Sequence, residues 1–351
     1  MISTAKTTTK PRAASFIELF TPKLVTVLRE GYGAGDFRAD VIAGLTVAIV
    51  ALPLSMAIAI ASGVTPDRGL YTAIVGGFFV SLLGGSRFQV GGPAGAFIVL
   101  VALTVERHGV DGVILATMMA GVFLVAAGLL QLGTYIKFIP YPVTVGFTAG
   151  IAVIIFASQL HDLFGFTLPG KEPGELLPKL AVLWHAAGTV NPWAFALAVL
   201  AILVMVGVRK LRPAWPSILI GVAVATVVAW ALALPVDTIG SRFGGIPESL
   251  PTPSLPAFSF AKAQAVLPDA VAFALLASIE SLLSAVVADG MTGRRHRSNC
   301  ELVAQGVANI AAPLFGGICV TGLIARTATN VRAGARGPIA GMMHSAFLLL
   351  F

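Results

Sequence analysis

Long apolar runs recur along the whole chain and are separated by short stretches rich in charged residues, glycine and proline. Runs of this length can cross the apolar core of a lipid bilayer as helices, so the pattern predicts an all-α polytopic membrane protein. About eleven candidate spans can be counted on this criterion. They lie near residues 41–62, 69–84, 92–105, 112–133, 138–160, 192–208, 214–234, 268–289, 299–314, 320–331 and 338–351.

Composition agrees with this pattern and excludes other classes of protein. Hydrophobic residues make up 57% of the 351 residues and charged residues only 11%, whereas a soluble domain carries roughly twice that charge. Cys300 and Cys319 are too few for a disulfide framework. No histidine has a metal-ligating partner at a useful spacing, and no nucleophile–base pair lies at membrane depth. We therefore expect no metal, no cofactor and no enzyme activity.

The basic residues indicate the orientation of the spans. The formal net charge is +7, but the basic side chains are spread over short loops, which does not favour nucleic-acid binding. With the N-terminus in the cytoplasm, sixteen of the 23 Lys and Arg residues fall inside, six outside, and Arg326 in the membrane. This asymmetry predicts a cytoplasmic N-terminus. The segment FIELFTPKLVTVLRE (residues 16–30) favours an interfacial helix over a disordered leader.

Two of the spans are too short to cross the bilayer as plain helices. One begins at Gln89 (QVGGPAGAFIVLVALTV) and the other at Cys319 (CVTGLIARTATNV). Each starts with an extended piece, continues through small residues and then becomes helical. Irregular backbone at membrane depth must be buried in protein or line a watery cavity. Because the two segments cross the membrane in opposite directions, they predict an inverted repeat whose half-helices meet near the midplane.

The position of Arg326 in the second broken span predicts an anion site. Two helix N-termini that converge present unpaired N–H groups and positive dipole ends. Small residues beside them let a ligand approach the backbone, and the guanidinium adds a full positive charge. The alternative is a structural arginine that pairs with a neighbouring carboxylate. Charges within membrane spans are usually functional, which favours the anion site.

Glu280 is a carboxylate near the middle of the span 268–289. A carboxylate at that depth is protonated, paired or exposed to water. Glu280 could couple proton movement to anion movement, or it could be a static partner of Arg326. Two other acidic residues are interpreted as structural. We expect Asp40 to cap a helix, and Ser298 and Glu301 to form a capping box at a helix start. We expect the loop around His296 to set orientation only.

Several motifs in order resemble the SulP family, the sulfate-permease-type anion transporters. They are DVIAGLTVAIVALPLSMAIAIASGVTPDRGLY, GGSRFQVGGPAGAF, IESLLSAVVADGMTG, NCELVAQGVANI and GLIARTATNVRAGARGP, from about residue 36 to the end. The resemblance implies a fourteen-helix fold similar to uracil permeases, with two inverted seven-helix repeats arranged as core and gate domains. It also implies a homodimer and a STAS domain after the last helix.

On this basis the chain divides into three parts. Residues 1–35 form a cytoplasmic and interfacial segment, residues 36–235 the first repeat, and residues 236–351 about four of the seven spans of the second. The final residues, HSAFLLLF, stop inside an apolar run. We therefore expect a piece of a longer protein, without its last spans or a STAS domain.

The resemblance also assigns a substrate site between the two broken spans, beside the first span. The substrate-binding residues it implies are Leu54, Ile58, Pro93, Ala94, Gly95, Ala96, Phe97, Thr321, Gly322, Leu323, Ile324, Ala325 and Arg326. Glu280 falls where proton-coupled relatives have a carboxylate. Leu54 stands where the family motif usually has glutamine, and Ala325 replaces a serine that some members have. Both changes make the site less polar.

The resemblance implies a secondary anion transporter in a bacterial inner membrane. The less polar site favours proton-coupled symport of a dicarboxylate such as fumarate, or of another small anion. The alternatives are a sulfate or bicarbonate transporter coupled to protons or sodium, and an anion channel. The expected partners are the anion, a proton or Na⁺, the lipid bilayer and a second copy of the chain, without nucleic acid.

Overall fold

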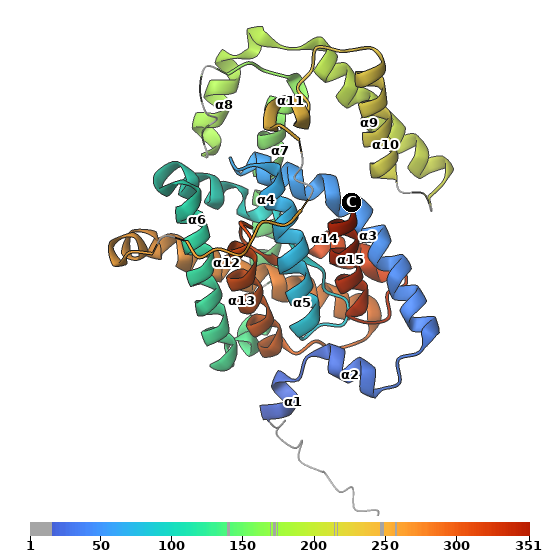
Figure 1. Ribbon diagram of the computed structural model, residues 1–351, viewed down its shortest axis with the longest axis vertical. Coiled ribbons are helices and arrows are strands. Elements are labelled where there is room, and N and C mark those ends of the chain that lie inside the picture. Colours follow the sequence, from blue (N-terminus) through green and yellow to red (C-terminus); the bar gives the residue numbers. More distant parts are fainter. Residues whose placement is uncertain are drawn as a thin grey trace, which may run out of the picture.

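The computed structural model describes residues 16–138, 141–168, 170, 173, 175–213, 215, 217–245, 249–256 and 258–351. Residues 1–15 of the expected N-terminal segment lie outside the described residues. Helices dominate the structure, as the apolar runs predict. Two groups of helices can be distinguished (Figure 1). We call α3–α6 with α12–α15 the packed bundle, and α7–α11 the lobe.

The first helices follow the expected spans closely. The N-terminal segment forms α1 (Phe16–Phe20) and α2 (Lys23–Arg29), and the first span is α3 (Ala34–Ala61). The second span consists of α4 (Pro66–Tyr71), the π-helix η1 (Thr72–Gly76) and α5 (Gly77–Leu83). Next come β1 (Gly91–Gly92), the short 3₁₀ helix η2 (Gly95–Phe97) and α6 (Ile98–Leu129). The predicted spans 92–105 and 112–133 are the two arms of this last element, because Gly109 (φ 69°, ψ −178°) breaks the helix between them.

The remaining elements complete the lobe and return to the bundle. The lobe begins after the 3₁₀ helix η3 (Leu132–Phe138) and contains α7 (Tyr141–Phe164), α8 (Leu176–His185), η4 (Ala187–Thr189), α9 (Pro192–Leu211), α10 (Ser217–Ala231) and α11 (Ile239–Phe243). The chain then forms α12 (Phe260–Thr292), α13 (Ser298–Leu314), β2 (Thr321–Gly322), α14 (Ile324–Arg332) and α15 (Ile339–Leu350).

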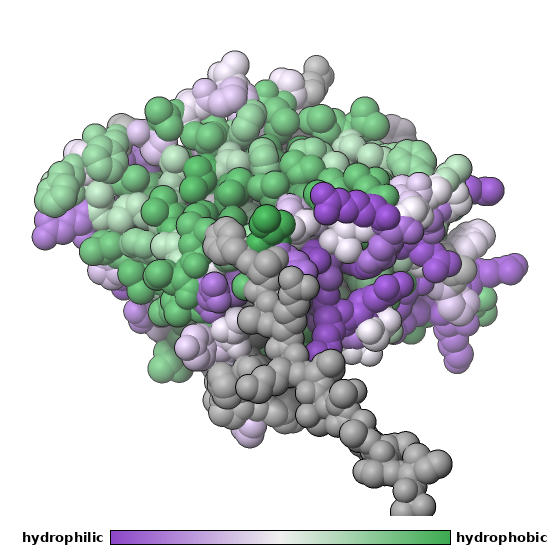
Figure 2. All heavy atoms as spheres, turned by 90° about the horizontal axis from the view of Figure 1, so that it is seen from below, coloured by the Kyte–Doolittle hydropathy of each residue, from purple (hydrophilic) through white to green (hydrophobic). Residues whose placement is uncertain are grey.

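Four helical stretches are long and apolar enough to cross a membrane by length and composition alone. They are Ala34–Ala61, Gly95–Leu129, Pro192–Leu211 and Phe260–Thr292, among the described residues. Three further apolar helical stretches among the described residues are shorter, Ala152–Phe164, Ser217–Ala231 and Ile339–Leu350. Seen from below the view of Figure 1, hydrophobic side chains form a broad surface, and hydrophilic ones gather on one side of it (Figure 2). This surface is typical of a membrane-embedded protein.

Small residues allow the helices of the packed bundle to approach closely. At the crossing of α6 and α13, a Cβ added to Gly306 would lie 2.6 Å from the carbonyl oxygen of Gly121, and one added to Gly121 would lie 2.7 Å from the carbonyl oxygen of Gly306. Backbone-to-backbone contact of this kind is the usual way in which membrane helices associate. The crossing therefore depends on both glycines.

The N-terminal segment forms two short helices instead of the single interfacial helix that we expected. The break falls at Thr21 and Pro22, since proline has no N–H to continue a helix. Arg297 holds the segment against the bundle, because its Nη1 donates to the carbonyl oxygen of Thr21 at 2.9 Å and to Thr26 Oγ1 at 2.8 Å. Burial, and then the charge of Arg297, lower the pKa of Lys23.

The prediction that Asp40 caps a helix start is wrong. Asp40 is fully buried and lies inside α3. Its Oδ1 accepts the N–H groups of Arg336 at 2.5 Å and Gly337 at 3.1 Å, just before α15, and its Oδ2 accepts the Tyr32 hydroxyl at 2.7 Å. Burial, and then this hydrogen bond to Asp40, raise the pKa of Tyr32. The carboxylate therefore connects α3 to a segment almost 300 residues later in the chain.

Candidate anion-binding site

The two broken spans meet in the middle of the packed bundle. β1 and β2 form a two-stranded antiparallel pair in which Gly91 is opposite Gly322 and Gly92 is opposite Thr321. The N–H of Leu323 continues the pair by donating to the carbonyl oxygen of Val90 at 3.0 Å. The antiparallel register means that the two segments run in opposite directions, as the predicted inverted repeat requires.

Glycines are needed where these strands pass their neighbours. A Cβ on Gly322 would lie 2.0 Å from Nε2 of Gln89, and one on Gly76 would lie 2.3 Å from a methyl carbon of Val320. The π-helix η1 provides a further contact, since Thr72 Oγ1 accepts the N–H of Ile318 at 2.7 Å. π-helical turns are often found at functional sites. Here the turn places a hydroxyl against the extended segment before β2.

Polar side chains of α12, α13, α14 and β2 itself hold the strand segments in place. Nδ2 of Asn309 donates to the carbonyl oxygen of Val320 at 2.7 Å, and Oδ1 of Asn309 accepts the N–H of Val320 at 2.9 Å. Thr327 Oγ1 accepts the N–H of Val90 at 3.2 Å and the hydroxyl of Ser284 at 3.1 Å. Thr321 Oγ1 donates to the carbonyl oxygen of Ala277 at 3.2 Å. These bonds satisfy backbone groups that regular helices would pair internally.

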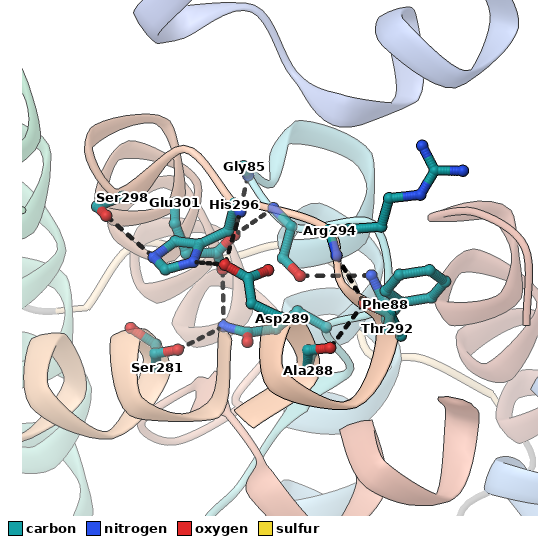
Figure 3. Close-up of polar contacts among 12 residues, drawn as sticks. Gly85, Phe88, Ser281, Ala288, Asp289, Thr292, Arg294, His296, Ser298 and Glu301 are labelled. Carbon is teal, nitrogen blue, oxygen red and sulfur yellow. Dashed lines mark hydrogen bonds and ion pairs between the residues drawn. The ribbon is translucent and has the colours of Figure 1, made fainter. Parts of the chain in front are cut away.

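Glu301 is the centre of polar contacts that reach the loop before β1 (Figure 3). Its Oε2 accepts the N–H groups of Gly85 at 2.9 Å and Ser86 at 3.1 Å, and its Oε1 accepts Nε2 of Gln89 at 2.8 Å and Nε2 of Gln305 at 2.9 Å. The predicted capping box is therefore wrong. The N-cap of α13 is Arg297, and the fully buried Glu301 binds a distant loop instead.

The loop around His296 does more than carry charge. Asp289 Oδ2, on α12, accepts the N–H of His296 at 2.9 Å and lies 2.7 Å from its Nδ1. The other ring nitrogen, Nε2, lies 2.9 Å from Ser298 Oγ (Figure 3). The histidine thus links the C-terminal end of α12 to the start of α13. The contacts of Glu301 fix the loop that leads into β1.

A cavity of about 400 Å³ lies at the two half-helix starts. The residues that line it are Leu54, Ala57, Ile58, Pro93, Gly95, Ala96, Ile98, Ile155, Gln159, Glu280, Leu323, Ile324, Ala325 and Arg326. Within the described part of the chain, no side chain caps the start of η2 or of α14. Backbone N–H groups at both starts are therefore available to a negatively charged ligand.

Arg326 is buried at the wall of this cavity and is only partly satisfied. Its Nη2 donates to Ser55 Oγ at 2.8 Å, while Nε and Nη1 have no hydrogen-bond partner. A Cβ on Gly92 would lie 2.5 Å from Nη1, so the glycine makes room for the guanidinium. A buried charged group without partners is costly, and a bound anion would supply the missing acceptors.

Glu280 lines the same cavity, but it is not paired with Arg326. Its Oε2 has no hydrogen-bond partner, and among the described residues no ion pair joins the two side chains. The alternative of a static pair is therefore not what the structure shows. The guanidinium of Arg326 and the carboxyl group of Glu280 therefore line the same cavity without pairing with each other.

Most of the expected substrate residues line the cavity, and four do not. Leu54, Ile58, Pro93, Gly95, Ala96, Leu323, Ile324, Ala325 and Arg326 are at its wall. Ala94 and Phe97 are buried in the main hydrophobic core, where Phe97 packs edge-on against Phe273. Thr321 and Gly322 are occupied by strand pairing. The sequence argument missed Ala57, Ile98, Ile155 and Gln159, and the last two come from α7 in the lobe, for which no local motif exists.

These features define a polytopic helical membrane protein with a cavity between two opposed half-helices. The model of the sulfate permease family matches residues 37–351, and the chain belongs to this family. The resemblance noted in the sequence motifs is thus confirmed.

Individual relatives agree with this assignment. The chain is 45% identical over 323 residues to a putative sulfate transporter of Bacillus subtilis, YvdB, and the match covers 92% of this chain and 61% of that protein. It is 33% identical over 326 residues to the bicarbonate transporter BicA of Picosynechococcus, with coverages of 90% and 57%. The chain therefore spans about 60% of the length of these relatives. They are transporters, not enzymes.

Solved structures confirm the predicted fold class. The transmembrane domain of a cyanobacterial BicA superposes with a TM-score of 0.78 at 33% identity, over 90% of this chain and 81% of that one. Murine Slc26a9, an anion transporter in its inward-facing state, gives a TM-score of 0.83 at 18% identity, over 98% and 61%. The second likeness concerns the fold alone.

Proposed function

We propose that this chain carries the substrate site of a secondary transporter for a small inorganic oxyanion, working by alternating access. The observation that carries the proposal is the incompletely satisfied Arg326 guanidinium at a cavity formed by two uncapped half-helix starts. The names of the relatives, which mention sulfate and bicarbonate, favour these anions over the dicarboxylate that the less polar site suggested.

Charge balance within the cavity favours a monovalent anion. Arg326 contributes one positive charge, and Glu280 contributes one negative charge only when it is ionised, so the empty site is neutral in that state. Binding of one monovalent anion together with one proton on Glu280 keeps it neutral. A divalent anion would leave a net negative charge in a medium of low dielectric constant, which is costly. Bicarbonate therefore fits better than sulfate, with Glu280 as the proton-coupling residue.

Sodium is the alternative coupling ion, since a cation beside the Glu280 carboxylate would balance the charge equally well. We further propose that the protein lies in the inner membrane of a bacterium with its N-terminus in the cytoplasm. We also propose that it acts as a homodimer, and that residues 36–235 and 236–351 belong to the two repeats. The excess of Lys and Arg on the expected inner side supports this orientation.

Uptake by the intact protein in liposomes tests the proposal. We expect uptake of labelled bicarbonate or sulfate, loss of at least about 100-fold with Arg326→Gln, and normal uptake with Arg294→Gln, a matched change at an exposed loop residue. The loss follows because a hydrogen bond to a charged group contributes about 1.5–3 kcal/mol and the guanidinium can offer two. Normal uptake by Arg326→Gln would contradict the site.

Glu280→Gln tests the coupling. The amide cannot gain or lose a proton in this range, so we expect anion binding to persist while acceleration by an inward proton gradient disappears. Measuring uptake with a proton gradient alone and with a sodium gradient alone identifies the coupling ion. If Glu280→Gln keeps full acceleration by the proton gradient, the residue does not couple protons.

A further inference from the structure

Gln159 is the third polar side chain at the cavity wall, beside Arg326 and Glu280. It lies on α7, whereas the other two lie on α14 and α12. All other side chains that line the cavity among the described residues are apolar. The carboxamide is therefore the one neutral group there that offers both hydrogen-bond donors and an acceptor.

The packing of α7 against the bundle explains why Gln159 lies at the cavity wall. Ile155 and Gln159 are four residues apart, so they occupy the same face of the helix. Ile155 lies against the half-helix start, because a Cβ on Gly95 would be 2.5 Å from its Cδ1. Gln159 is thereby placed one turn further along the same cavity wall. Its side chain is exposed and makes no hydrogen bond to the described residues, so its two N–H groups and its carbonyl oxygen are available to a ligand.

We propose that Gln159 is a specificity-determining residue that selects an oxyanion carrying an O–H group, such as bicarbonate, over sulfate. This inference rests on the proposed function. Bicarbonate can accept an N–H of the carboxamide and donate its O–H to the carbonyl oxygen. Sulfate has no proton at neutral pH and can only accept. Sulfate engages only the N–H groups of the carboxamide, so it gains one hydrogen bond fewer there than bicarbonate does.

The first test is the transport ratio of the two anions. In liposomes containing the intact protein, we expect Gln159→Leu to lower the kcat/KM ratio of bicarbonate to sulfate by about 10-fold, which corresponds to about 1.4 kcal/mol. Val153→Leu is the matched control, since Val153 is on the same helix but exposed on another face. Leu54 lines the same cavity from α3, so the double variant Leu54→Gln/Gln159→Leu should recover part of the ratio.

The second test detects the contact directly. Both native cysteines are buried, so a single introduced cysteine can be labelled selectively. We expect bicarbonate to slow the reaction of Gln159→Cys with a small neutral thiol reagent by at least about 5-fold, consistent with a direct contact at the ligand. Val153→Cys should react at the same rate with and without bicarbonate.

The outcomes separate this inference from the proposed function. If the unsubstituted protein takes up neither anion, the proposed function itself is overturned. If it transports them, and Gln159→Leu leaves the ratio unchanged while bicarbonate fails to protect Gln159→Cys, then only the role of Gln159 is overturned. A changed ratio together with protection supports it.

Discussion

The packed bundle and the lobe bury the side chains of their helices to very different extents. In α13, most of the residues are buried, including the polar Asn299, Glu301, Gln305 and Asn309. In α9, a helix of 20 residues, none is buried, and in α10 only Gly221 is. Exposed side chains of the lobe include large apolar ones such as Leu203 at 64% and Trp230 at 82%.

This difference shows that apolar character alone does not build a site in a membrane protein. Lipid is as apolar as leucine, so hydrophobic side chains give membrane helices little reason to associate. Small residues and satisfied polar groups hold the bundle together, and these same groups position β1, β2 and Arg326. The lobe faces its surroundings with ordinary apolar side chains, and among the described residues it reaches the cavity through α7 alone.

The largest loss of stability is expected on substitution of Glu301, whose carboxylate accepts four hydrogen bonds within the bundle. Glu301→Leu would leave four buried N–H groups without an acceptor, and we expect a loss of about 4 kcal/mol in the free energy of unfolding. Thermal unfolding in detergent, followed by size-exclusion chromatography, measures it. Glu106→Leu, at an exposed position, should change little. Equal melting of both variants would contradict the role of the network.

The second largest loss of stability is expected for a substitution at the crossing of α6 and α13. Gly306→Val would place side-chain atoms against the backbone of Gly121, and we expect a loss of about 3 kcal/mol from overpacking. Gly207→Val in α9 is the matched control, because nothing lies within 4 Å of a Cβ at that position. The yield and melting temperature of folded protein report both changes. If Gly207→Val were the more damaging, the contrast between bundle and lobe would be reversed.

The smallest effect is expected on the exposed surface of the lobe. Leu203→Ala removes a side chain that is 64% exposed, so we expect a change below about 0.5 kcal/mol. The comparison is Leu302→Ala, where the side chain is 2% exposed in the bundle and the expected loss is about 2–5 kcal/mol. Melting curves of the two variants in the same detergent measure the difference. Similar losses would show that the lobe is packed against a further surface.

Much of the fold and of the candidate site could be predicted from local patterns in the sequence. Runs of apolar residues are visible without any contact information, so the membrane class and most spans could be predicted. The paired breaks at Gln89 and Cys319 could also be predicted, because glycine, proline and an extended start mark irregular backbone locally. Arg326 and Glu280 stood out for the same reason, since each is a charge in an apolar segment.

Local patterns failed where a side chain bonds to a distant part of the chain. Ser298 and Glu301 have the spacing of a capping box, yet the carboxylate of Glu301 binds a loop 216 residues earlier. Asp40 likewise has the position of a cap but serves the loop before α15. The same residue type at the same spacing can satisfy local or distant N–H groups, and sequence spacing does not distinguish the two.

The sequence by itself determined that the chain crosses a membrane, that two of its spans are broken, and that a guanidinium and a carboxylate lie within apolar segments. These properties depend on the composition of single segments. The tertiary structure alone decided which walls meet around the cavity and placed Gln159 of the lobe in the same wall as Arg326 and Glu280. Such neighbours are set by how helices pack, and packing depends on shape complementarity between segments that are far apart along the chain.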